Sequence, residues 1–312
     1  MSGKYVTETL EADESGVARA AALLRGGGLV ALPTETVYGL AARADNADAV
    51  ARIYAAKGRP SFNPLIVHVA SIEQAERLAR FSPVALELTE KHWPGPLTLV
   101  LPRREDAGLA EAVTAGLDTV AIRVPAHPVM RKVLGKAGYP LAAPSANRSG
   151  FISPTRANHV LVSLDGRISA VLDGGECRAG IESTILAVRG DGRIEVLRPG
   201  PVDAGSRKIH ASDEGIEAPG QLASHYSPGK PMRLGVTKPE DDEFFIGFAD
   251  LTGDCSLSLH GDIEEAASRL YACLHEAALS EKSRIAVAPI PEKSIGNAIN
   301  DRLKRAATPA ER

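Results

Sequence analysis

Two cations stand one residue apart at a break between predicted elements, in the segment Lys57-Gly58-Arg59-Pro60. A guanidinium such as Arg59 can grip two phosphate oxygens at once, and an ammonium such as Lys57 acts as a point charge. The pair could therefore hold a phosphorylated substrate. It could also simply complement the dipole of the helix that ends there, and taken alone it favours that interpretation.

A third cation, Arg123, closes the apolar run that begins at Thr119. Alternation along a strand places Thr119, Ala121 and Arg123 on one face, so a hydroxyl and a guanidinium could address the same cavity. An arginine embedded in this way needs an anionic partner or an open, wet site. A structural salt bridge and a binding site are therefore the two interpretations.

Small residues follow another predicted strand in the segment 142–150, AAPSANRSG, and continue to Ser153 and Thr155. Small side chains let backbone N–H groups approach an anion, and hydroxyl and amide groups add donors without bulk. The loop could bind phosphate, although it lacks P-loop spacing, and an ordinary turn with an Asn cap is the alternative. The glycine-marked segments 180–184 and 198–200 offer similar turns beside Ser183.

The segment 33–40, PTETVYGL, also follows an apolar run, where α/β sheets usually hold their ligands. Its hydroxyls and carboxylate could orient a small polar substrate. The alternative, which the segment alone favours, is a strand-to-helix turn capped by Thr34 or Thr36. His68 ends a further strand, and a histidine in that place is more often structural than a ligand.

These segments require an α/β frame, because short β-type runs alternate with helical patterns from Gly28 to about Leu197. Helices are predicted over 46–57 and 71–81, with a capping box formed by Ser71 and Gln74. The strands are too uniformly apolar to face solvent, which predicts a sheet covered on both faces. The predicted strands are 28–34, 65–69, 97–101, 119–124, 140–145, 168–173 and 182–188.

The period is lost between about Val202 and Pro228, which predicts a linker or lid. We therefore expect a first domain over 1–205, a linker over 206–229 and a small α/β domain over 230–312. That last domain is predicted to be Rossmann-like, without a Gly-rich phosphate fingerprint. Its predicted strands are 231–236, 243–248 and 284–290, and its predicted helices are 263–280 and 294–305.

Composition favours a globular protein that does not bind nucleic acid through many phosphates, since 44% of residues are hydrophobic and the net charge is −3. The three cysteines have no CxxC spacing and leave at least one thiol unpaired under any pairing scheme, which favours a reducing compartment. No signal-peptide core and no apolar span of membrane length is present in the sequence. A cytoplasmic protein is expected.

Taken together, the motifs resemble the threonylcarbamoyl-AMP synthase family, the YrdC-like proteins, in its two-domain form. The resemblance covers nearly the whole chain, more loosely in the C-terminal third. The segments that carry it are PTETVYGL (33–40), KGRPSFNPLIVH (57–68), TAGLDTVAIRVPAHP (114–128), APSANRSG (143–150), GIESTI (180–185), LRPG (197–200), APGQLASHYSP (218–228) and SIGNAINDRLKRA (294–306).

The resemblance implies a twisted mixed-sheet domain around a positively charged cavity for ATP and L-threonine. By it, Lys57 and Arg59 are catalytic. The residues implied on the ATP side are Arg59, Asn63, Thr119, Ser145, Asn147, Ser153, Arg198 and Tyr226. Those implied for threonine or its carbamate are Thr36, His68, Arg123, Ala143 and Ser183.

The implied reaction joins L-threonine, bicarbonate or CO2, and ATP into threonylcarbamoyl-AMP, with Mg²⁺ as a cofactor whose ligands are unassigned. The stretch around His225 and Tyr226 would close over the nucleotide. A downstream threonylcarbamoyl-transferase complex is a possible partner, contact with tRNA is expected to be indirect or weak, and no membrane is involved. Two alternatives stay open: a module that binds double-stranded RNA, and an enzyme that adenylates carbamoyl phosphate, although the zinc-finger and acylphosphatase-like segments of the latter are missing.

Overall fold

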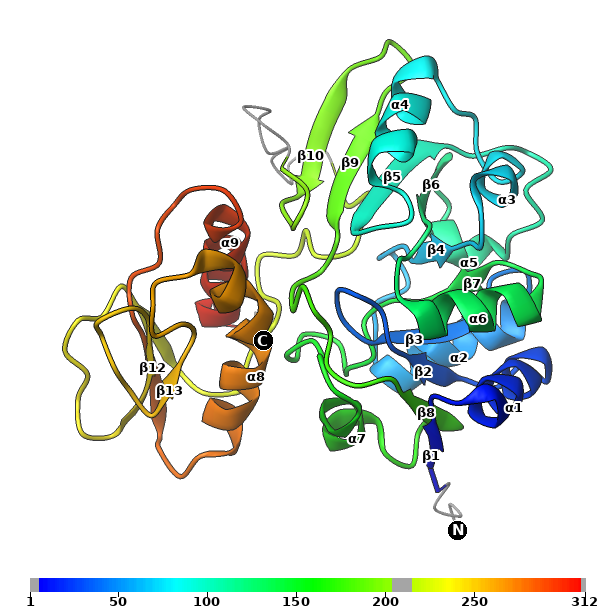
Figure 1. Cartoon of the computed structure of the whole chain (residues 1–312). Helices are drawn as coiled ribbons and strands as arrows, with labels where there is room; N and C mark the ends of the chain where they lie inside the picture. Colours follow the sequence, from blue (N-terminus) through cyan, green and yellow to red (C-terminus); the bar gives the residue numbers. More distant parts are fainter. Residues whose placement is uncertain (1–5, 204–214, 310–312) are drawn as a thin grey trace.

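The computed structural model describes residues 6–203 and 215–309, which form two β-sheets with helices packed on them (Figure 1). We call residues 6–203 the large-sheet unit, 215–229 the connecting segment and 230–309 the small-sheet unit. The predicted boundary at 205/206 falls in 204–214, outside the described residues, and the boundary at 229/230 falls just before the first strand of the small sheet.

The large sheet has ten strands in the order β1-β8-β2-β3-β7-β4-β6-β5-β9-β10. Parallel and antiparallel pairs both occur, for example β4 with β6 and β5 with β6, so the predicted mixed sheet is confirmed. The strands are β1 (Glu8–Glu11), β2 (Val30–Leu32), β3 (Gly39–Arg43), β4 (Ile66–His68), β5 (Leu97–Pro102), β6 (Thr119–Arg123), β7 (Leu141–Ala142), β8 (Ala170–Asp173), β9 (Thr184–Val188) and β10 (Ile194–Arg198).

Helices cover both faces of this sheet, as the apolar strands predict. Val30 and Leu32 pack with α1 and α6 on one face, whereas Ala31 between them packs with α2 and α7 on the other. The Asn46 side chain caps α2, and Gly58 ends it in the left-handed conformation. The helices are α1 (Glu14–Arg25), α2 (Ala47–Lys57), α3 (Ile72–Glu76), α4 (Pro83–His92), α5 (Glu111–Thr114), α6 (Pro128–Ala137) and α7 (Ala157–Leu164).

Two local predictions need correction. The helix expected over 71–81 ends at Glu76, and although Ser71 accepts from the Gln74 N–H, the Gln74 side chain bonds the N–H of Ala70 instead of completing a capping box. The segment 33–40 does not enter a helix, because β2 and β3 pair antiparallel on either side of it. It is a strand-to-strand turn that needs no helix cap.

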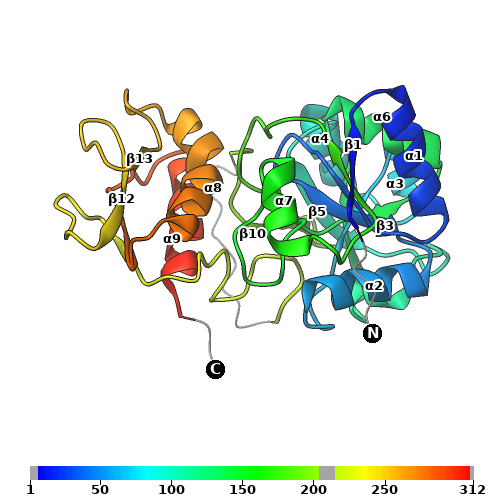
Figure 2. The same cartoon turned by 90° about the horizontal axis from the view of Figure 1, so that it is seen from below.

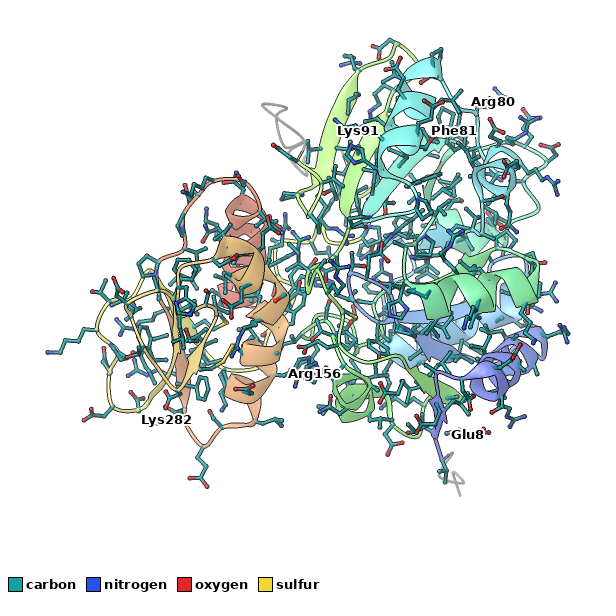
Figure 3. The ribbon with its side chains drawn as sticks, in the orientation of Figure 1. Glu8, Arg80, Phe81, Lys91, Arg156 and Lys282 are labelled. Carbon is teal, nitrogen blue, oxygen red and sulfur yellow. A yellow bond between two sulfur atoms is a disulfide. The ribbon has the colours of Figure 1, made fainter. Side chains whose placement is uncertain are left out.

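The small sheet is parallel throughout, in the order β11-β14-β12-β13, as a Rossmann-like unit requires. Its strands are β11 (Met232–Leu234), β12 (Glu243–Gly247), β13 (Cys255–Ser256) and β14 (Arg284–Val287). Its helices, α8 (Ile263–Leu279) and α9 (Gly296–Ala307), lie on the side of the sheet that faces the large-sheet unit in both views (Figures 1 and 2). Lys282 lies at the edge of the small-sheet unit that is away from the large-sheet unit, where its ammonium donates to the Asp241 carbonyl, whereas Arg156 lies at the inner boundary (Figure 3).

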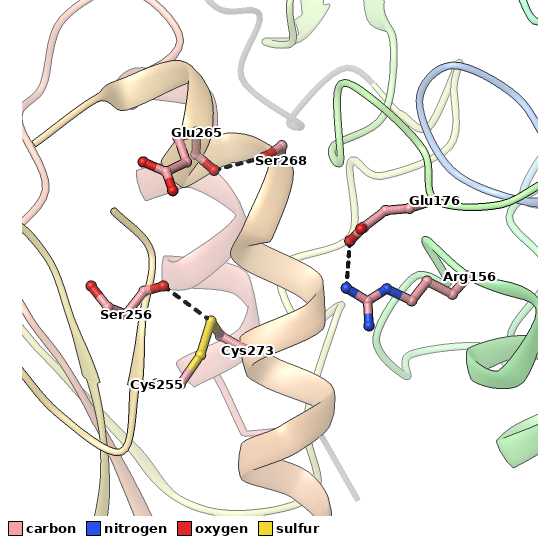
Figure 4. Close-up of a disulfide and its surroundings, with 7 residues drawn as sticks. All are labelled: Arg156, Glu176, Cys255, Ser256, Glu265, Ser268 and Cys273. Carbon is pink, nitrogen blue, oxygen red and sulfur yellow. Dashed lines mark hydrogen bonds and ion pairs between the residues drawn. A yellow bond between two sulfur atoms is a disulfide. The ribbon is translucent and has the colours of Figure 1, made fainter. Parts of the chain in front are cut away.

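A disulfide joins Cys255 of β13 to Cys273 of α8 (Figure 4). The third cysteine, Cys177, is free and buried, in agreement with the expectation of at least one unpaired thiol. The preference for reduced cysteines is not met by the other two. Spacing could not reveal this pair, because eighteen residues separate two cysteines that strand and helix packing bring together.

Among the described residues, no helix is both long and apolar enough to cross a membrane.

Candidate functional site

A small cavity lies where the ends of the central strands of the large sheet meet the connecting segment. Its free volume is about 40 Å³. Buried cations and hydroxyls dominate its wall, which is formed by Thr34, Thr36, Val37, Gly39, Arg59, Ile66, His68, Arg123, Ala143, Pro144, Ser145, Glu182, Ser183, Arg198, Pro219, Gly220, His225 and Tyr226.

Arg123, the last residue of β6, is fixed on one side of the cavity by the turn between β2 and β3. Its Nη2 lies 2.5 Å from Glu35 Oε1, its Nη1 donates to Thr36 Oγ1 at 2.9 Å, and its Nε donates to the Gly95 carbonyl. The second Glu35 oxygen accepts from the N–H groups of Ala126 and His127, just before α6. Although burial raises the pKa of Glu35, the Arg123 charge brings that pKa below its ordinary value, so the carboxylate is ionised.

Thr34 shapes the turn that carries Glu35 and Thr36. Its hydroxyl accepts from the N–H groups of Thr36 and Val37 and donates to the Val37 carbonyl at 2.6 Å. A threonine in this role satisfies a tight turn without any helix. The hydroxyl of Thr36 is thereby directed to Arg123.

His68 ends β4 beside Arg123 and is buried. Burial first, and the Arg123 charge second, lower the pKa of His68 to about 3. Its Nδ1 has no hydrogen-bond partner within the described structure. The ring is therefore neutral and keeps one polar atom available beside the cavity.

Two further arginines form the opposite side of the cavity. Arg198 ends β10 and donates to both the carbonyl and the hydroxyl of Ser183, and that hydroxyl also contacts Thr98. Arg59 donates to the Asn63 side chain at 2.5 Å and to the Pro64 carbonyl at 2.8 Å. Burial lowers the pKa of Arg59 to about 10, so it is still charged at neutral pH.

Lys57 does not reach the cavity wall. Its ammonium donates to the carbonyls of Ser145 and Asn147, and thereby ties the loop after β7 to the end of α2. Burial, and then the charge of Arg59, lower the pKa of Lys57 well below its ordinary value. The Asn147 amide, in turn, donates to the carbonyls of Arg148 and Phe151 within the same loop.

Glu182 is a buried carboxylate in the cavity wall just before β9. It accepts from the Ser153 hydroxyl at 2.6 Å, from the Tyr271 hydroxyl and, at 2.9 Å, from Arg302 Nε. Burial would raise its pKa, but the charges of Arg302 and Arg198 together with these hydrogen bonds lower it to about 2. The carboxylate is therefore ionised at neutral pH.

Tyr226 and His225, from the connecting segment, cover the cavity. Tyr226 adopts a positive φ of 63°, which is unusual for an aromatic residue and marks a backbone held by its surroundings. Its ring lies near Tyr271 and under the Arg302 guanidinium. Burial lowers the pKa of His225 to about 3, so that this ring is also neutral.

The structure brings nine of the predicted site residues to the cavity wall: Arg59, Ser145, Arg198, Tyr226, Thr36, His68, Arg123, Ala143 and Ser183. Asn63, Asn147, Ser153 and Lys57 lie behind it and hold wall residues in place. Thr119 is not brought there, because it stands at the opposite end of β6, four residues or about 13 Å from Arg123.

Sequence reasoning missed Glu182, and it gave the Glu35 carboxylate a role in orienting substrate, not the ion pair with Arg123 that the structure shows. A signal for both was present, because each carboxylate stands in a segment that is otherwise apolar or uncharged next to a predicted strand. A buried carboxylate needs a cation, and each of these two has an arginine. Their partners could not be identified from spacing, since 88 and 120 residues separate the pairs.

Comparisons with known proteins agree with the two sheets. The family model described as "Telomere recombination" matches residues 22–200, and the model described as "Threonylcarbamoyl-AMP synthase, C-terminal domain" matches 181–308. A threonylcarbamoyl-AMP synthase of Bacillus subtilis is 40% identical, over 97% of this chain and 96% of the relative. One of Pyrococcus abyssi is 40% identical, over 92% and 93%. The crystal structure of P. abyssi Sua5 complexed with L-threonine superposes with a TM-score of 0.86 at 37% identity, covering 97% of both chains.

Proposed function

Because the chain belongs to the threonylcarbamoyl-AMP synthase family, we propose that it makes threonylcarbamoyl-AMP and pyrophosphate from L-threonine, bicarbonate or CO2, and ATP, for the modification of tRNA. One observation carries the proposal for this site: three buried arginines, Arg59, Arg123 and Arg198, line one small cavity together with several hydroxyls. Such a wall suits two anionic substrates, a nucleotide and an amino acid.

The two sides of the cavity suggest which substrate lies where. Arg123 has five N–H donors, of which three are engaged by Gly95, Thr36 and Glu35, so two remain for the threonine carboxylate. We assign threonine and its carbamate to this side, with Thr36, His68, Ala143 and Ser183. The nucleotide takes the side of Arg59 and Arg198, with Ser145 and Tyr226.

The reaction needs no covalent bond to the protein. The neutral amine of threonine adds to CO2 and loses a proton, giving a carbamate. A carbamate oxygen then attacks the α-phosphorus of ATP, and the bond from that phosphorus to the bridging oxygen of pyrophosphate breaks. Both reactants are anions, so the arginines lower the barrier by offsetting their repulsion and by aligning them.

Lys57 contributes to this alignment indirectly in our proposal. Its ammonium holds the carbonyls of Ser145 and Asn147, and Asn63 holds Arg59. Lys57 and Asn147 therefore act by fixing the loop after β7, and Ser153 acts through Glu182. Thr119 stays a prediction without support from its position.

Magnesium enters only as the ion that accompanies ATP. Among the described residues, no group of three histidine, cysteine or carboxylate side chains could hold a metal ion. Glu182, the carboxylate that the described part of the chain contributes to the cavity wall, already has Arg302, Tyr271 and Ser153 as partners. The donor set does not fit a protein-held metal, so phosphate oxygens and water would hold the ion.

Substrate entry requires the connecting segment to move, because a cavity of about 40 Å³ cannot contain a nucleotide. Pro219, Gly220, His225 and Tyr226 form the part of the wall that belongs to this segment. We propose that they open for entry and close afterwards. Closure would protect the mixed anhydride from water until it is released.

Of the alternatives, binding of double-stranded RNA is disfavoured by the net charge of −3 and by the inward direction of the three arginines. We propose a cytoplasmic location, where a threonylcarbamoyl-transferase complex could receive the product and contact with tRNA would be indirect. In this proposal, the formation of threonylcarbamoyl-AMP needs neither the transferase complex nor tRNA.

The proposal is tested by pyrophosphate release from ATP at fixed Mg²⁺, with threonine and bicarbonate present or omitted and without RNA. Release that requires both substrates is the expected result. No release under any combination would reject the synthase reaction, and RNA binding that weakens steeply with salt would then favour the alternative.

A further inference from the structure

The small-sheet unit contacts the cavity wall through Glu182. Glu182 belongs to the large-sheet unit, yet two of its three side-chain partners, Tyr271 and Arg302, come from the small-sheet unit. The third is Ser153, in the loop that follows the predicted phosphate segment. All four side chains are buried.

Helix α8 presents one face to the large-sheet unit. Ser268, Tyr271 and His275 are spaced three and four residues apart, so they lie on one face of the helix. Their contacts in the large-sheet unit are Gly180, Glu182 and Ser153, respectively. The Ser268 backbone packs closely on Gly180. A Cβ added at Gly180 would lie 2.3 Å from the carbonyl oxygen of Ser268. The His275 Nε2 lies 3.3 Å from the Ser153 carbonyl, and both views place α8 at this boundary (Figures 1 and 2).

Helix α9 adds Arg302, the largest side chain that is completely buried. Its guanidinium donates to Glu182, to Asp301 and to the Pro199 carbonyl next to Arg198, and it lies over the Tyr226 ring. The Arg302 guanidinium therefore contacts two segments that border the nucleotide side of the cavity. One is the end of β10, at Pro199, and the other is the connecting segment, at Tyr226.

An ion pair that only stabilised the interface between the two units could lie anywhere along that interface. Glu182 of this pair lies in the cavity wall, and the hydrogen bonds of the pair reach Ser153 and the Pro199 carbonyl next to Arg198. The Arg302 guanidinium also lies over the Tyr226 ring. Because Glu182 also balances the charge of Arg198, any displacement of the carboxylate changes the field that a bound phosphate would meet.

We propose that Tyr271 and Arg302 are positioning residues through which the small-sheet unit, acting on Glu182, sets the geometry of the nucleotide side of the cavity. The inference rests on the proposed function for the identity of the nucleotide. It makes the small-sheet unit part of the binding site and more than a support for the connecting segment.

The test uses the full chain and compares Tyr271→Phe, Arg302→Gln, Glu182→Gln and the double variant Y271F/E182Q. Tyr139→Phe and Arg284→Gln are the matched controls, because Tyr139 packs against Arg43 and Arg284 pairs with Glu240 and Asp242, and neither residue lines the cavity. The Kd for ATP is measured by calorimetry at a temperature at which each variant is folded, alongside thermal melting and the KM for threonine.

Tyr271→Phe removes one oxygen and keeps the ring, so it should fold. We expect it to weaken ATP binding by roughly three- to tenfold, with less change in the KM for threonine, and Arg302→Gln to weaken ATP binding more. Because both act through one carboxylate, the Y271F and E182Q effects should not add. The two control variants should bind ATP as the wild type does.

Lower melting temperatures with an unchanged Kd for ATP in Y271F and R302Q would show that the cluster only stabilises the fold, and would overturn the inference. Additive effects of Y271F and E182Q would also overturn it. A wild type that binds ATP but releases no pyrophosphate would reject the proposed function while the variants still decide the inference. A wild type that does not bind ATP would reject both.

Discussion

Arg123 illustrates how one guanidinium serves the fold and leaves donors for a ligand. A carboxylate, a hydroxyl and a carbonyl hold it, and this fixes the plane in which the two remaining N–H groups point. A lysine could replace the charge but not the planar fork.

Arg123→Lys should therefore raise the KM for threonine by roughly tenfold or more, since a charge-assisted hydrogen bond contributes about 1.5–3 kcal/mol. The Kd for ATP should stay within about twofold, because Arg59 and Arg198 are untouched. Steady-state pyrophosphate release with threonine varied gives the first value and calorimetry the second. Arg131→Lys, on the exposed side of α6, is the control, and an unchanged threonine KM in R123K would contradict the assignment.

Two stacked histidines at the boundary between the units predict acid sensitivity. The rings of His159 and His275 lie 4.0 Å apart, and burial is the main cause that lowers the pKa of His159 to about 4 and that of His275 to about 3. Below the ordinary pKa of 6.5 the unfolded chain binds protons that the folded chain does not. The free energy of unfolding should therefore fall as the pH is lowered from 6.5 towards 4.

Melting temperatures between pH 7 and pH 5 measure this dependence. His275→Gln keeps a donor for the Ser153 carbonyl but does not titrate, so its melting temperature should depend less on pH than that of the wild type. The exposed His260→Gln is the control. Identical pH dependence in the wild type and H275Q would show that His275 does not contribute.

At the scale of elements, Gly180 of the large-sheet unit packs directly against the backbone of α8. Gly180 has a φ of 67°, and an added Cβ would meet three backbone atoms of Ser268 within 2.5 Å. Backbone cannot rotate out of the way as a side chain can, so α8 as a whole would have to shift.

Gly180→Ala should destabilise the chain by about 2 kcal/mol or more, through strain at a positive φ together with overpacking. Gly190→Ala is the matched control, because nothing lies within 4 Å of its added Cβ. Denaturant unfolding of both variants measures the difference. Equal free energies of unfolding for Gly180→Ala and Gly190→Ala would mean that the two units can move apart at this contact without loss of stability.

The disulfide fastens β13 to α8 behind the face that holds Glu182 (Figure 4). Closing a loop of eighteen residues restricts the unfolded chain and corresponds to about 3 kcal/mol. Reduction, or the pair Cys255→Ser and Cys273→Ser, should lower the melting temperature. Calorimetry with and without reductant checks this, with Cys177→Ser as control, and an insensitive wild type would contradict it.

At the scale of the whole molecule, the sequence predicts where strands and helices begin and end better than it predicts which strands lie side by side in the sheet. The apolar runs 97–101 and 119–124 and the helical pattern of 46–57 predict β5, β6 and α2 nearly to the residue, because these signals are local. The order β1-β8-β2-β3-β7-β4-β6-β5-β9-β10 places segments side by side that are far apart in the chain, and no periodicity contains that information.

The candidate site divides in the same way. Arg123 was predictable because an embedded cation stands out at the end of an apolar run, whereas Arg198 was expected from the family resemblance. The roles of Lys57, Asn63 and Ser153 behind the wall depend on contacts with carbonyls and a carboxylate that only the packed structure reveals.

The partnership of Glu182 with Arg302 constrains how such a protein can change during evolution. A lineage that lost the small-sheet unit in one event would keep a negative charge in the cavity wall with neither the Arg302 guanidinium nor the Tyr271 hydroxyl to balance it. The exchange of Glu182 for a neutral residue would have to come with that loss or before it. A shortened descendant should therefore bear the trace of its missing half at position 182.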